Sequence, residues 1–429
     1  MLHEAVILAG GQGSRLKDVV GDKPKCLVEI GHRPILYHQF DLLRKHGLRK
    51  VLILAGEKAD QVVAAADQGK QFGLEVTVLQ ESRLRGTAWA LHNARSLMAD
   101  DVVLLYGDTL LNVDLGDMLE FARREDAHAV FAVKASGSPH ASTLFEVDPE
   151  NSRIVELYPT PRVDHTLQML PCDNQSFCGV AVIGPDLLNS PPTTEVEDFV
   201  ASYLQNQLGK HCCAYNKVPY AKDVGTLFGL KTAANAYRLG LLDCEKRGAI
   251  FLDRDGVLNE IQKNGFVNAA DEFHLRRDVA RGVELLRQLG FFIFVVTNQG
   301  GIELGHLTSD DLREIHHRAD YLLETTHPGA CIDKYYHCPH FNADCGCRKP
   351  LTGMITQAAE EYPVNLYKSF VVGDMITDLE MADHANITSA LVISDLTNIP
   401  EDSRAQPHYT CASLLEFAIL LRNQGITAV

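Results

Sequence analysis

Short apolar runs of strand length alternate with amphipathic stretches of helical spacing through the first part of the chain. The pattern predicts strands at residues 5–9, 51–55, 76–79, 102–106 and 129–133, and helices at residues 34–46, 59–68, 87–98 and 115–124. Such alternation is typical of a mainly parallel sheet with helices on its faces. The segment 137–178 breaks the alternation and is rich in Pro, Asp and Asn, so we predict irregular insertions there that serve substrate binding.

A second pattern of strands and helices begins near residue 249. It predicts strands at residues 249–252, 291–296 and 369–372 and helices at residues 279–289 and 309–324, the latter with Ser309 as its N-cap. The polar segment 243–247, which follows a helical stretch at 232–242, is the best candidate for a linker. We therefore predict an α/β protein of two domains, residues 1–240 and 249–429, joined by a linker at 241–248. Each domain is expected to contain a mainly parallel sheet flanked by helices.

Composition and charge narrow the possible functions. The chain has 429 residues, of which 46% are hydrophobic and 22% charged, as in ordinary globular proteins. Its formal net charge of −16 repels nucleic acid, so we expect no nucleic-acid partner, and anionic substrates must be bound by local basic residues. The N-terminus lacks the features of a signal peptide, and the strongest apolar run, 291–296, is too short to cross a bilayer. We expect a cytoplasmic protein without a membrane partner, and the sequence leaves open whether it forms a homo-oligomer.

A glycine-rich turn, Gly-Gly-Gln-Gly-Ser-Arg-Leu at residues 10–16, follows the first predicted strand. Its glycines let backbone N–H groups approach phosphate oxygens, and Arg15 and Lys25 supply the positive charge that a triphosphate and a departing pyrophosphate need. Leu16 stands where a dinucleotide-binding motif has its third glycine, and the Gly-Lys-(Ser/Thr) of a P-loop is absent from the sequence. By itself such a turn is more often a tight connection from strand to helix. The candidate phosphate-binding residues of the turn are Gly10, Gly11, Gly13 and Ser14.

The same string, with Pro-Lys at residues 24–25, closely resembles the signature of the sugar-phosphate nucleotidyltransferases, and the resemblance extends over residues 1 to about 235. It implies a Rossmann-like fold in which a sugar 1-phosphate oxygen attacks the α-phosphorus of a nucleoside triphosphate and releases pyrophosphate. It also implies that Asp108 and Asp223 hold a Mg²⁺ that bridges the two substrates. The residues that match positions reading the base and the sugar are Gln80, Glu81, Gly86, Thr87 and Glu197. Two segments, 156–158 and 176–179, depart from the family pattern, so the resemblance does not identify the sugar substrate.

Two aspartates, Asp253 and Asp255, follow the predicted strand at residues 249–252. Carboxylates two residues apart project to the same side as the chain leaves a strand, so one can attack phosphorus while the other protonates the leaving oxygen. Two close carboxylates need a cation, which predicts Mg²⁺. An Asx-type turn is the simplest alternative. An EF-hand is excluded, because no acidic ligand set continues through the next residues.

Three later segments complete this second constellation: Thr-Asn-Gln at 297–299, Arg-Lys-Pro at 348–350 and Gly-Asp-Met-Ile-Thr-Asp at 373–378. Together with the aspartate pair they resemble the haloacid dehalogenase-like phosphohydrolases over about residues 247–400. The resemblance implies a Rossmannoid fold in which Asp253 is the nucleophile and Asp255 the general acid and then the base. The further assignments are Thr297, Asn298 and Lys349 for the phosphoryl group and substrate, Asp374 for Mg²⁺ with Asp253 and the backbone carbonyl of Asp255, and Asp378 for orientation.

A short loop carries Cys338, His340, Cys345 and Cys347 in a C-x-H-x4-C-x-C spacing. Three thiolates and one imidazole are the soft ligand set of a tetrahedral, structural Zn²⁺ site. Isolated cysteines and histidines are usually core or surface residues, whereas this grouping predicts zinc, with His337 a weaker candidate ligand. The loop immediately precedes Arg348 and Lys349, so the metal is expected to fix a segment that presents these cations to substrate.

The zinc loop and the segments 253–259 and 297–301 resemble the histidinol-phosphate and heptose-bisphosphate phosphatases. For this chain we hypothesise that Arg348 contacts a second anionic group on the substrate. A heptose-bisphosphate phosphatase makes a sugar 1-phosphate that a nucleotidyltransferase consumes, so the fusion implies activation of D-glycero-D-manno-heptose, with GTP as the favoured nucleotide. One alternative is a histidinol-phosphatase or other small-substrate phosphatase fused to a hexose 1-phosphate nucleotidyltransferase. Another is that one half is a non-catalytic regulatory module. The sequence does not fix the base, the anomer or any transfer of intermediate between sites.

Overall fold

The computed structural model describes residues 3–11, 21–56, 58–81, 85–137, 139, 142–159, 173–194, 198–200, 208, 211–262, 267–341, 345–394, 397, 399–400 and 403–429. The chain divides into two compact units. The first unit comprises Met1–Lys134, Ala141–Arg162 and Gln175–Asp243, and the second comprises Ala135–His140, Val163–Asn174 and Cys244–Val429. Each unit is an α/β fold with its own hydrophobic cores, which confirms the predicted fold class. Among the described helices, none is both long and apolar enough to span a membrane.

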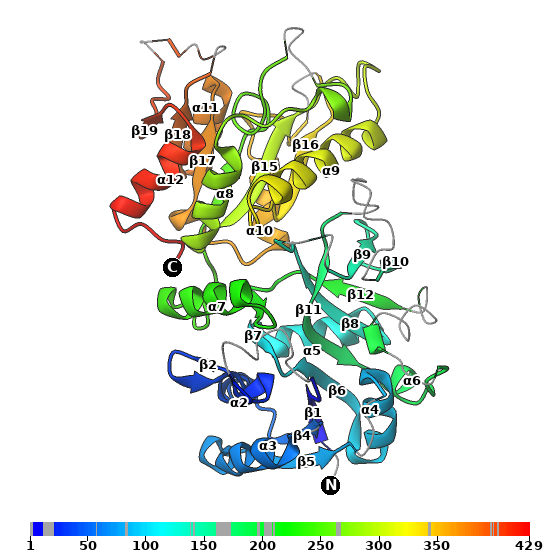
Figure 1. The fold of residues 1–429 in the computed structure, drawn as a ribbon. Coiled ribbons are helices and arrows are strands. Elements are labelled where there is room, and N and C mark those ends of the chain that lie inside the picture. The colour runs from blue at the N-terminus through cyan, green and yellow to red at the C-terminus, as the bar shows by residue number, and fades with distance from the viewer. Residues whose placement is uncertain are drawn as a thin grey trace. The chain divides into compact units, whose positions relative to one another are not determined.

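The first unit is built on a nine-stranded mixed sheet with the central order β10-β9-β11-β6-β1-β4-β5, and β8 joins β11 to β12 (Figure 1). Its parallel centre pairs β1 with β4 and β6, so that Leu8 lies opposite Leu54 and Tyr106. The strand β11 runs antiparallel to β6, β8 and β9. The strands are β1 (His3–Ala9), β4 (Lys50–Ala55), β5 (Glu75–Gln80), β6 (Met98–Tyr106), β8 (Ala129–Lys134), β9 (Leu144–Val147), β10 (Ile154–Tyr158), β11 (Ser176–Ile183) and β12 (Cys212–Tyr215).

Helices cover both faces of this sheet because successive strand residues point to opposite sides. Ala5 and Ile7 belong to the core under α2, α3 and α5, whereas Val6 belongs to the core under α4. A small ribbon of β7 and β13 crosses beside the sheet and brings the end of β13 to the end of β6. The elements are α2 (Ile35–Lys45), α3 (Ala59–Ala66), α4 (Thr87–Ala94), α5 (Leu115–Arg124), α6 (Pro185–Leu188), α7 (Leu227–Leu239), β7 (Thr109–Asn112) and β13 (Tyr220–Asp223).

The prediction of irregular structure over residues 137–178 is wrong, because β9, β10 and the start of β11 lie within it. In β10 only Ile154 and Leu157 are buried, so the strand lacks a regular alternation of apolar and polar residues. Its hydrogen-bond partner β9 stabilises it instead. Short strands of this kind depend on tertiary pairing more than on their own sequence.

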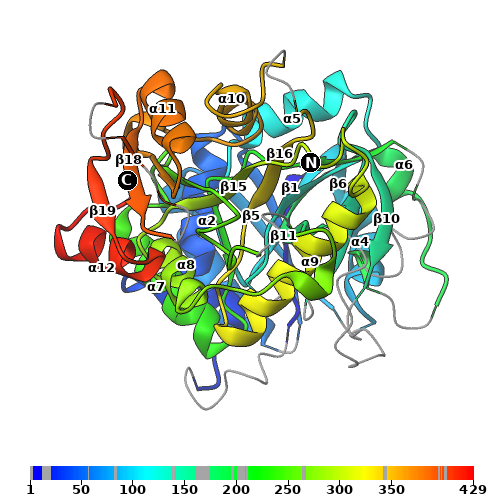
Figure 2. The same cartoon turned by 90° about the horizontal axis from the view of Figure 1, so that it is seen from above.

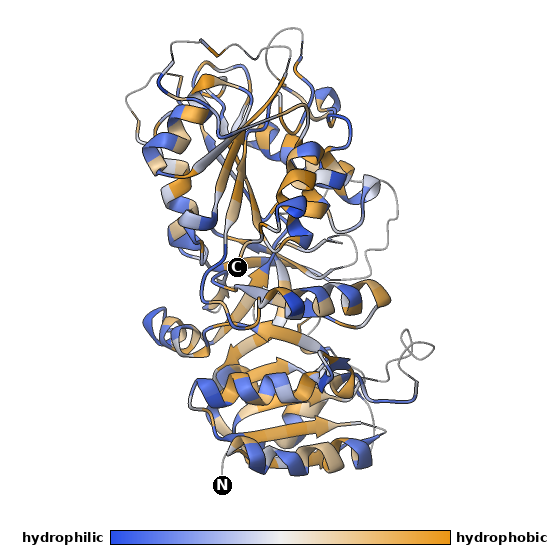
Figure 3. Cartoon of the chain, turned by 90° about the vertical axis from the view of Figure 1, so that its left-hand side faces the viewer, coloured by the Kyte–Doolittle hydropathy of each residue, from blue (hydrophilic) through white to orange (hydrophobic). Residues whose placement is uncertain are grey.

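The second unit contains a fully parallel six-stranded sheet in the order β16-β15-β14-β17-β18-β19. Helices α8, α9 and α12 cover one face, and α10 and α11 cover the other (Figures 1 and 2). Figure 3 shows the strands as hydrophobic and the helices as two-sided, as expected for a sheet buried on both faces. The elements are β14 (Ala249–Leu252), α8 (Val279–Gln288), β15 (Phe292–Asn298), α9 (Ser309–Thr326), β16 (Lys334–Cys338), α10 (Gly353–Glu361), β17 (Phe370–Gly373), α11 (Ile376–Ala385), β18 (Thr388–Val392), β19 (Tyr409–Cys411) and α12 (Leu414–Asn423).

The predicted N-cap of α9 is wrong by one residue. The hydroxyl of Thr308 accepts a hydrogen bond from the backbone N–H of Asp311, and the Asp311 carboxylate accepts one from the Thr308 backbone, which is a complete capping box. Ser309 is therefore the first residue of the helix. Threonine and serine are both good caps, and the reciprocal acid three residues later selects Thr308.

Candidate active sites

The first candidate site lies where β6, β13 and the short helix η2 (Lys25–Leu27) meet in the first unit. The Nζ atom of Lys25 is 2.8 Å from Oδ2 of Asp108, which follows β6. The backbone of Asp108 accepts a hydrogen bond from Val224, so the ends of β6 and β13 are tied together. A Cβ on Gly225 would lie 3.5 Å from Lys25 Nζ and 2.7 Å from Asp223 Oδ1, so Lys25 and Asp223 are close neighbours.

The structure thus brings together one cation and two carboxylates at the edge of the parallel strands. A Cβ on Gly11 would lie within 3.9 Å of Lys25 Nζ, so the described part of the glycine-rich turn reaches the same place. Carboxylate oxygens are ligands that Mg²⁺ prefers, and Asp108 and Asp223 fit such an ion. Gly10 directly follows β1. Gly13, Ser14, Arg15 and Glu197 lie outside the described residues.

The residues expected to read the base and sugar lie around β5 and the start of α4. Gln80 is the exposed last residue of β5, and burial raises the pKa of the neighbouring Glu81 to about 7. Gly86, with a φ of 89°, is the N-cap of α4. The hydroxyl of Thr87 donates to the Asp198 carboxylate (3.0 Å) and accepts from the backbone of Phe199 (2.7 Å). In this structure Thr87 therefore fixes the segment at 198–199.

The second candidate site is a buried charge cluster at the carboxyl ends of β14 and β17. Lys349 Nζ lies 2.7 Å from Oδ1 of Asp253 and 2.8 Å from Oδ1 of Asp378. Asp253 follows β14, Asp374 follows β17, and Asp378 lies in the first turn of α11. Parallel strands place their carboxyl ends at one edge, which is why residues far apart in sequence converge here.

Burial dominates the electrostatics of this cluster. It raises the pKa of Asp253 to about 8 even though Lys349 opposes the shift, and it raises the pKa of Asp374 to about 6. Burial alone would lower the pKa of the Lys349 amine. The negative charges of Asp253 and Asp378 outweigh this effect, so the pKa is raised. Three buried carboxylates with one cation leave negative charge that a metal ion would neutralise.

The oxygens of Asp253, Asp374 and Asp378 lie within 4.8 Å of one another, as a metal site requires. The Oδ1 atom of Asp374 is buried without a hydrogen-bond partner among the described residues, while its Oδ2 accepts from Ser394 (2.6 Å). Both oxygens of Asp378 are engaged, one by Lys349 and the other by the backbone of Met375. Asp253 and Asp374 are therefore the better metal ligands, and Asp378 orients Lys349.

The turn after the nucleophile candidate can be made only by glycine. Gly256 has a φ of +87°, and a Cβ at this position would collide with the carboxylate of Asp374. The close approach brings the turn at residues 253–256 against the end of β17. It places the backbone of Asp255 near the candidate metal ligands.

The side chain of Asp255 is held by residues to which the sequence motifs assign no role. Asn259 Nδ2 donates to its Oδ1 (3.0 Å) and Gln299 Nε2 donates to its Oδ2 (3.1 Å). Arg254 contacts both oxygens. Gln299 also donates to the hydroxyl of Thr297 (2.8 Å), so the candidate acid and the candidate phosphate ligand share one amide. Asn259 and Gln299 belong to the recognised segments, but only their contacts reveal what they do.

Asn298, expected to bind substrate, is engaged with the backbone of Lys349 instead. Its Oδ1 accepts from the Lys349 N–H (3.0 Å) and its Nδ2 donates to the Lys349 carbonyl (3.2 Å). This pair of hydrogen bonds attaches the loop that carries Lys349 to the end of β15. Asn298 therefore positions the lysine in this structure.

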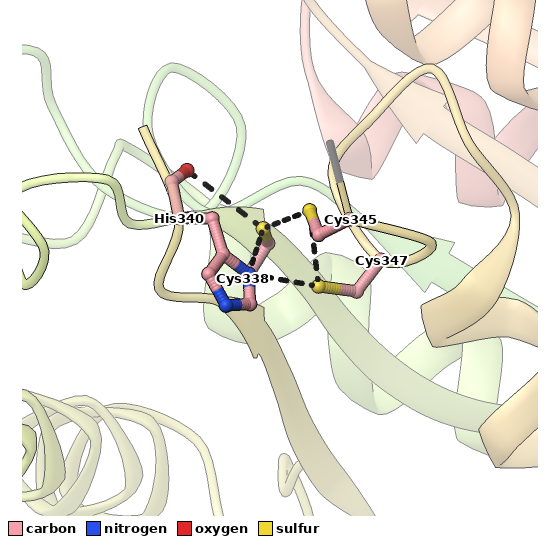
Figure 4. A group of neighbouring side chains, drawn as sticks. All are labelled: Cys338, His340, Cys345 and Cys347. Atoms are coloured by element: carbon pink, nitrogen blue, oxygen red, sulfur yellow. Dashed lines mark hydrogen bonds between the residues drawn. The ribbon is translucent and has the colours of Figure 1, made fainter. Parts of the chain in front are cut away.

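Cys338, His340, Cys345 and Cys347 converge at the end of β16 (Figure 4). The sulfurs of Cys338 and Cys345 are 3.5 Å apart, and Nδ1 of His340 lies 3.6 Å from the first and 3.5 Å from the sulfur of Cys347. Burial raises the pKa of the Cys345 thiol, but hydrogen bonds from the backbone of Arg348 and Cys347 outweigh it and lower this pKa to about 6. The four side chains fit a closed tetrahedral metal site.

The same loop reaches the second site through Arg348. Its Nη1 donates to the carbonyl of His340 (2.7 Å), and its guanidinium lies 5.9 Å from the ring centre of Phe341. The next residue, Lys349, is the lysine of the buried charge cluster. A metal bound to the loop would therefore restrain the position of both cations.

Comparison with known proteins relates the two parts of the chain to two different families. A nucleotidyl transferase family model matches residues 4–238, and a model described as HAD-hydrolase-like matches residues 346–417. The D-glycero-β-D-manno-heptose-1,7-bisphosphate 7-phosphatase of Pasteurella multocida is 32% identical over 181 residues, which are 41% of this chain and 96% of that protein. The D-glycero-α-D-manno-heptose-1,7-bisphosphate 7-phosphatase of Campylobacter jejuni is 32% identical over 151 residues, 35% of this chain and 84% of that protein.

Among solved structures, HddC from Yersinia pseudotuberculosis is 21% identical and covers 55% of this chain and 100% of its own, with a TM-score of 0.47. The predicted combination of a nucleotidyltransferase with a haloacid dehalogenase-like phosphatase is confirmed by the family models and relatives. The chain belongs to the nucleotidyl transferase family and, through its phosphatase part, to the family of the D-glycero-D-manno-heptose-1,7-bisphosphate 7-phosphatases.

Proposed function

We propose that this chain is a bifunctional enzyme of nucleotide-activated heptose biosynthesis. Its phosphatase part removes the 7-phosphate of D-glycero-D-manno-heptose 1,7-bisphosphate, and its transferase part joins GMP from GTP to the resulting heptose 1-phosphate. The observation that carries the proposal is that one chain contains both the Asp253–Lys349–Asp378 cluster and the Lys25–Asp108 site. The first suits release of a phosphate and the second suits consumption of a sugar 1-phosphate. Because the transferase reaction consumes a nucleoside triphosphate, we place the protein in the cytoplasm without a membrane partner. Its net charge of −16 disfavours a nucleic-acid partner.

In the phosphatase reaction, a carboxylate oxygen of Asp253 attacks the 7-phosphorus, and Asp255 protonates the departing sugar oxygen. Lys349 and Thr297 hold the phosphoryl oxygens. Asp255 then takes a proton from the water that releases phosphate from Asp253. Mg²⁺, held by Asp253, Asp374 and the backbone carbonyl of Asp255, would supply charge neutralisation at the phosphoryl group.

In the transferase reaction, the substrate provides the nucleophile, so the protein needs only to position two phosphates and stabilise the pyrophosphate. Lys25 lies beside the described part of the glycine-rich turn and is suited to contact the triphosphate, with Arg15 as the second cation. Mg²⁺ held by Asp108 and Asp223 would supply further neutralisation. The residues that we propose to contact the base and the sugar are Gln80, Glu81, Gly86, Thr87 and Glu197.

We expect zinc in the loop at 338–347 to support phosphatase activity indirectly. Cys345→Ser should lose stoichiometric zinc and lower the phosphatase kcat by about tenfold or more, because Arg348 and Lys349 lose the restraint on their loop. Metal content measured by mass spectrometry, with both activities assayed in the same sample, checks this. Cys411→Ser, a buried cysteine elsewhere in the same unit, is the control. Full phosphatase activity in zinc-free Cys345→Ser would contradict this role.

Arg348 is expected to recognise the 1-phosphate of the bisphosphate substrate. Arg348→Ala should raise KM for heptose 1,7-bisphosphate by about 10- to 100-fold, because a charge-assisted hydrogen bond contributes about 1.5–3 kcal/mol. KM for a sugar monophosphate should change much less. Steady-state phosphate release with both substrates checks this. An equal rise in KM for both would show that Arg348 does not read a second anionic group.

Comparing substrates directly tests the proposed function. We expect kcat/KM for heptose 1,7-bisphosphate to exceed that for histidinol phosphate by at least about tenfold, since the second phosphate adds charge-assisted contacts. Testing the α and β anomers side by side identifies the one whose product the transferase accepts. Preference for histidinol phosphate would support the alternative, a histidinol-phosphatase fused to a hexose 1-phosphate nucleotidyltransferase. If the wild-type protein lacks one of the two activities altogether, the result would support the alternative that this half of the chain is a non-catalytic regulatory module.

A further inference from the structure

Arg254 stands between the two aspartates of the phosphatase site, yet the reaction described above does not use it. Its side chain is 1% exposed, whereas that of Asp255 is 28% exposed. The Nη2 atom lies 2.9 Å and 3.1 Å from the two carboxylate oxygens of Asp255. A fully buried guanidinium is costly to desolvate, so a position of this kind needs a specific reason.

The contact completes a cradle around the Asp255 carboxylate. Oδ1 receives Asn259 Nδ2 at 3.0 Å and Oδ2 receives Gln299 Nε2 at 3.1 Å, while Arg254 spans both oxygens. Donors from three directions leave the carboxylate little freedom to rotate. The backbone carbonyl of Arg254 also accepts from Leu258 and Asn259, so the turn that carries the cradle is itself closed by hydrogen bonds.

The charge of Arg254 acts on two nearby buried or partly buried histidines, His316 and His337. His316 stacks on Tyr335 with ring centroids 4.2 Å apart, and burial, followed by the charge of Arg254, lowers the pKa of His316 well below its usual range. Burial and Arg254 lower the pKa of the neighbouring His337 as well. Among the described residues, Nε and Nη1 of Arg254 have no hydrogen-bond partner, and Asp255 is the carboxylate that pairs with its charge. The arginine is thus directed at one carboxylate.

We propose that Arg254 is a positioning residue for the acid–base step, holding Asp255 with Asn259 and Gln299 in line with the leaving oxygen. The inference rests on the proposed role of Asp255. As the Asp253–phosphorus bond forms and the ester P–O bond breaks, the Asp255 proton passes to the sugar oxygen. When water then bonds to phosphorus and the Asp253–phosphorus bond breaks, the water proton returns to Asp255.

Leaving-group dependence tests the proposal. A sugar alkoxide must be protonated as it departs, whereas p-nitrophenolate leaves without a proton. Arg254→Met should lower kcat for heptose 1,7-bisphosphate by about 10- to 100-fold, with KM changed by less than about threefold, because misplacing an acid of this kind loses most of its contribution. With p-nitrophenyl phosphate, kcat should change by less than about threefold. Arg254→Lys should show the same selectivity with a smaller loss, and it carries the test if Arg254→Met does not fold.

Two further variants distinguish the positioning role of Arg254 from a general effect of breaking an ion pair and from a wrong assignment of Asp255. Asp255→Asn should show the same selectivity with a larger loss. Arg287→Met breaks another ion pair of this unit, in which a partly buried arginine lies 2.8 Å from the buried Asp333, and it should leave the ratio of the two rates unchanged. Equal losses on both esters in the Arg254 variants, or no loss at all, would overturn the positioning role. Absence of selectivity in Asp255→Asn would instead overturn the assignment of Asp255 as the acid, and with it the proposed mechanism.

Discussion

Replacing Asp253 with asparagine is expected to lower phosphatase turnover by about 10⁴-fold or more, because the reaction loses its proposed nucleophile. The substitution keeps the size of the side chain, but a neutral amide cannot form the phosphoryl–enzyme bond. The change also removes one carboxylate from the candidate metal site and one partner from Lys349, whose Nζ lies 2.7 Å from Asp253 Oδ1. Phosphate release from the bisphosphate, measured at saturating Mg²⁺, checks the prediction.

The same sample provides the control. Asp253 belongs to the second unit and the transferase residues Lys25 and Asp108 belong to the first, so the transferase rate with heptose 1-phosphate should stay within about twofold of wild type. Mass spectrometry of the protein during turnover should detect a phosphorylated species in wild type and none in the variant. Retention of more than about 1% of phosphatase turnover would refute the assignment of Asp253 as the nucleophile.

Replacing Lys25 with alanine is expected to lower the transferase rate by about 10²- to 10³-fold, as for loss of a group that stabilises transition-state charge. Lys25 is held 2.8 Å from Asp108, and its Nζ lies beside Gly11 and Gly225, where a triphosphate would approach the turn. Removing it leaves both the incoming nucleotide and the departing pyrophosphate less neutralised. Pyrophosphate release with GTP and heptose 1-phosphate gives the rate.

Lys23→Ala is the matched control for this change. Lys23 lies two residues earlier, and its side chain is 53% exposed and pairs with Glu29 at 3.1 Å on the surface. Loss of such a pair is worth about 0–1 kcal/mol, so Lys23→Ala should leave the transferase rate nearly unchanged. Phosphatase activity should be unaffected in both variants. Equal effects of the two substitutions would mean that general charge around the turn matters, and that Lys25 has no specific contact.

Strong apolar runs predicted the parallel cores well, because strands buried on both faces need continuous apolar sequence. Residues 249–252 and 115–124 match β14 and α5 from end to end. The predicted helix at 232–242 is displaced, since α7 runs from Leu227 to Leu239. The Thr226 hydroxyl accepts a hydrogen bond from the backbone N–H of Gly229 and caps the helix, which therefore begins earlier than predicted. The glycine in this first turn weakens the helical pattern of the sequence there. The strands β9 and β10 depend on pairing that a single sequence does not reveal.

The catalytic candidates were predictable because phosphoryl chemistry needs particular side chains at the ends of strands. The motifs identified four residues, and the structure brings them into one cluster: Asp253, Lys349, Asp374 and Asp378. The motifs could not show which residues hold the others in place. Asn298 forms two hydrogen bonds with the backbone of Lys349, and only the three-dimensional contacts reveal this role. Supporting hydrogen bonds of this kind can be made by many residue types, so they leave little signature in a sequence.

The most direct test of the central claim follows both steps in a single reaction. Purified protein is mixed with Mg²⁺, GTP and D-glycero-D-manno-heptose 1,7-bisphosphate, each anomer separately, and products are identified by mass spectrometry. The account predicts release of phosphate and formation of GDP-heptose from one anomer. Asp253→Asn should make none from the bisphosphate yet still make it from heptose 1-phosphate. If wild type releases phosphate but forms no nucleotide-heptose from either anomer with any nucleoside triphosphate, the claim that one chain performs consecutive steps is contradicted.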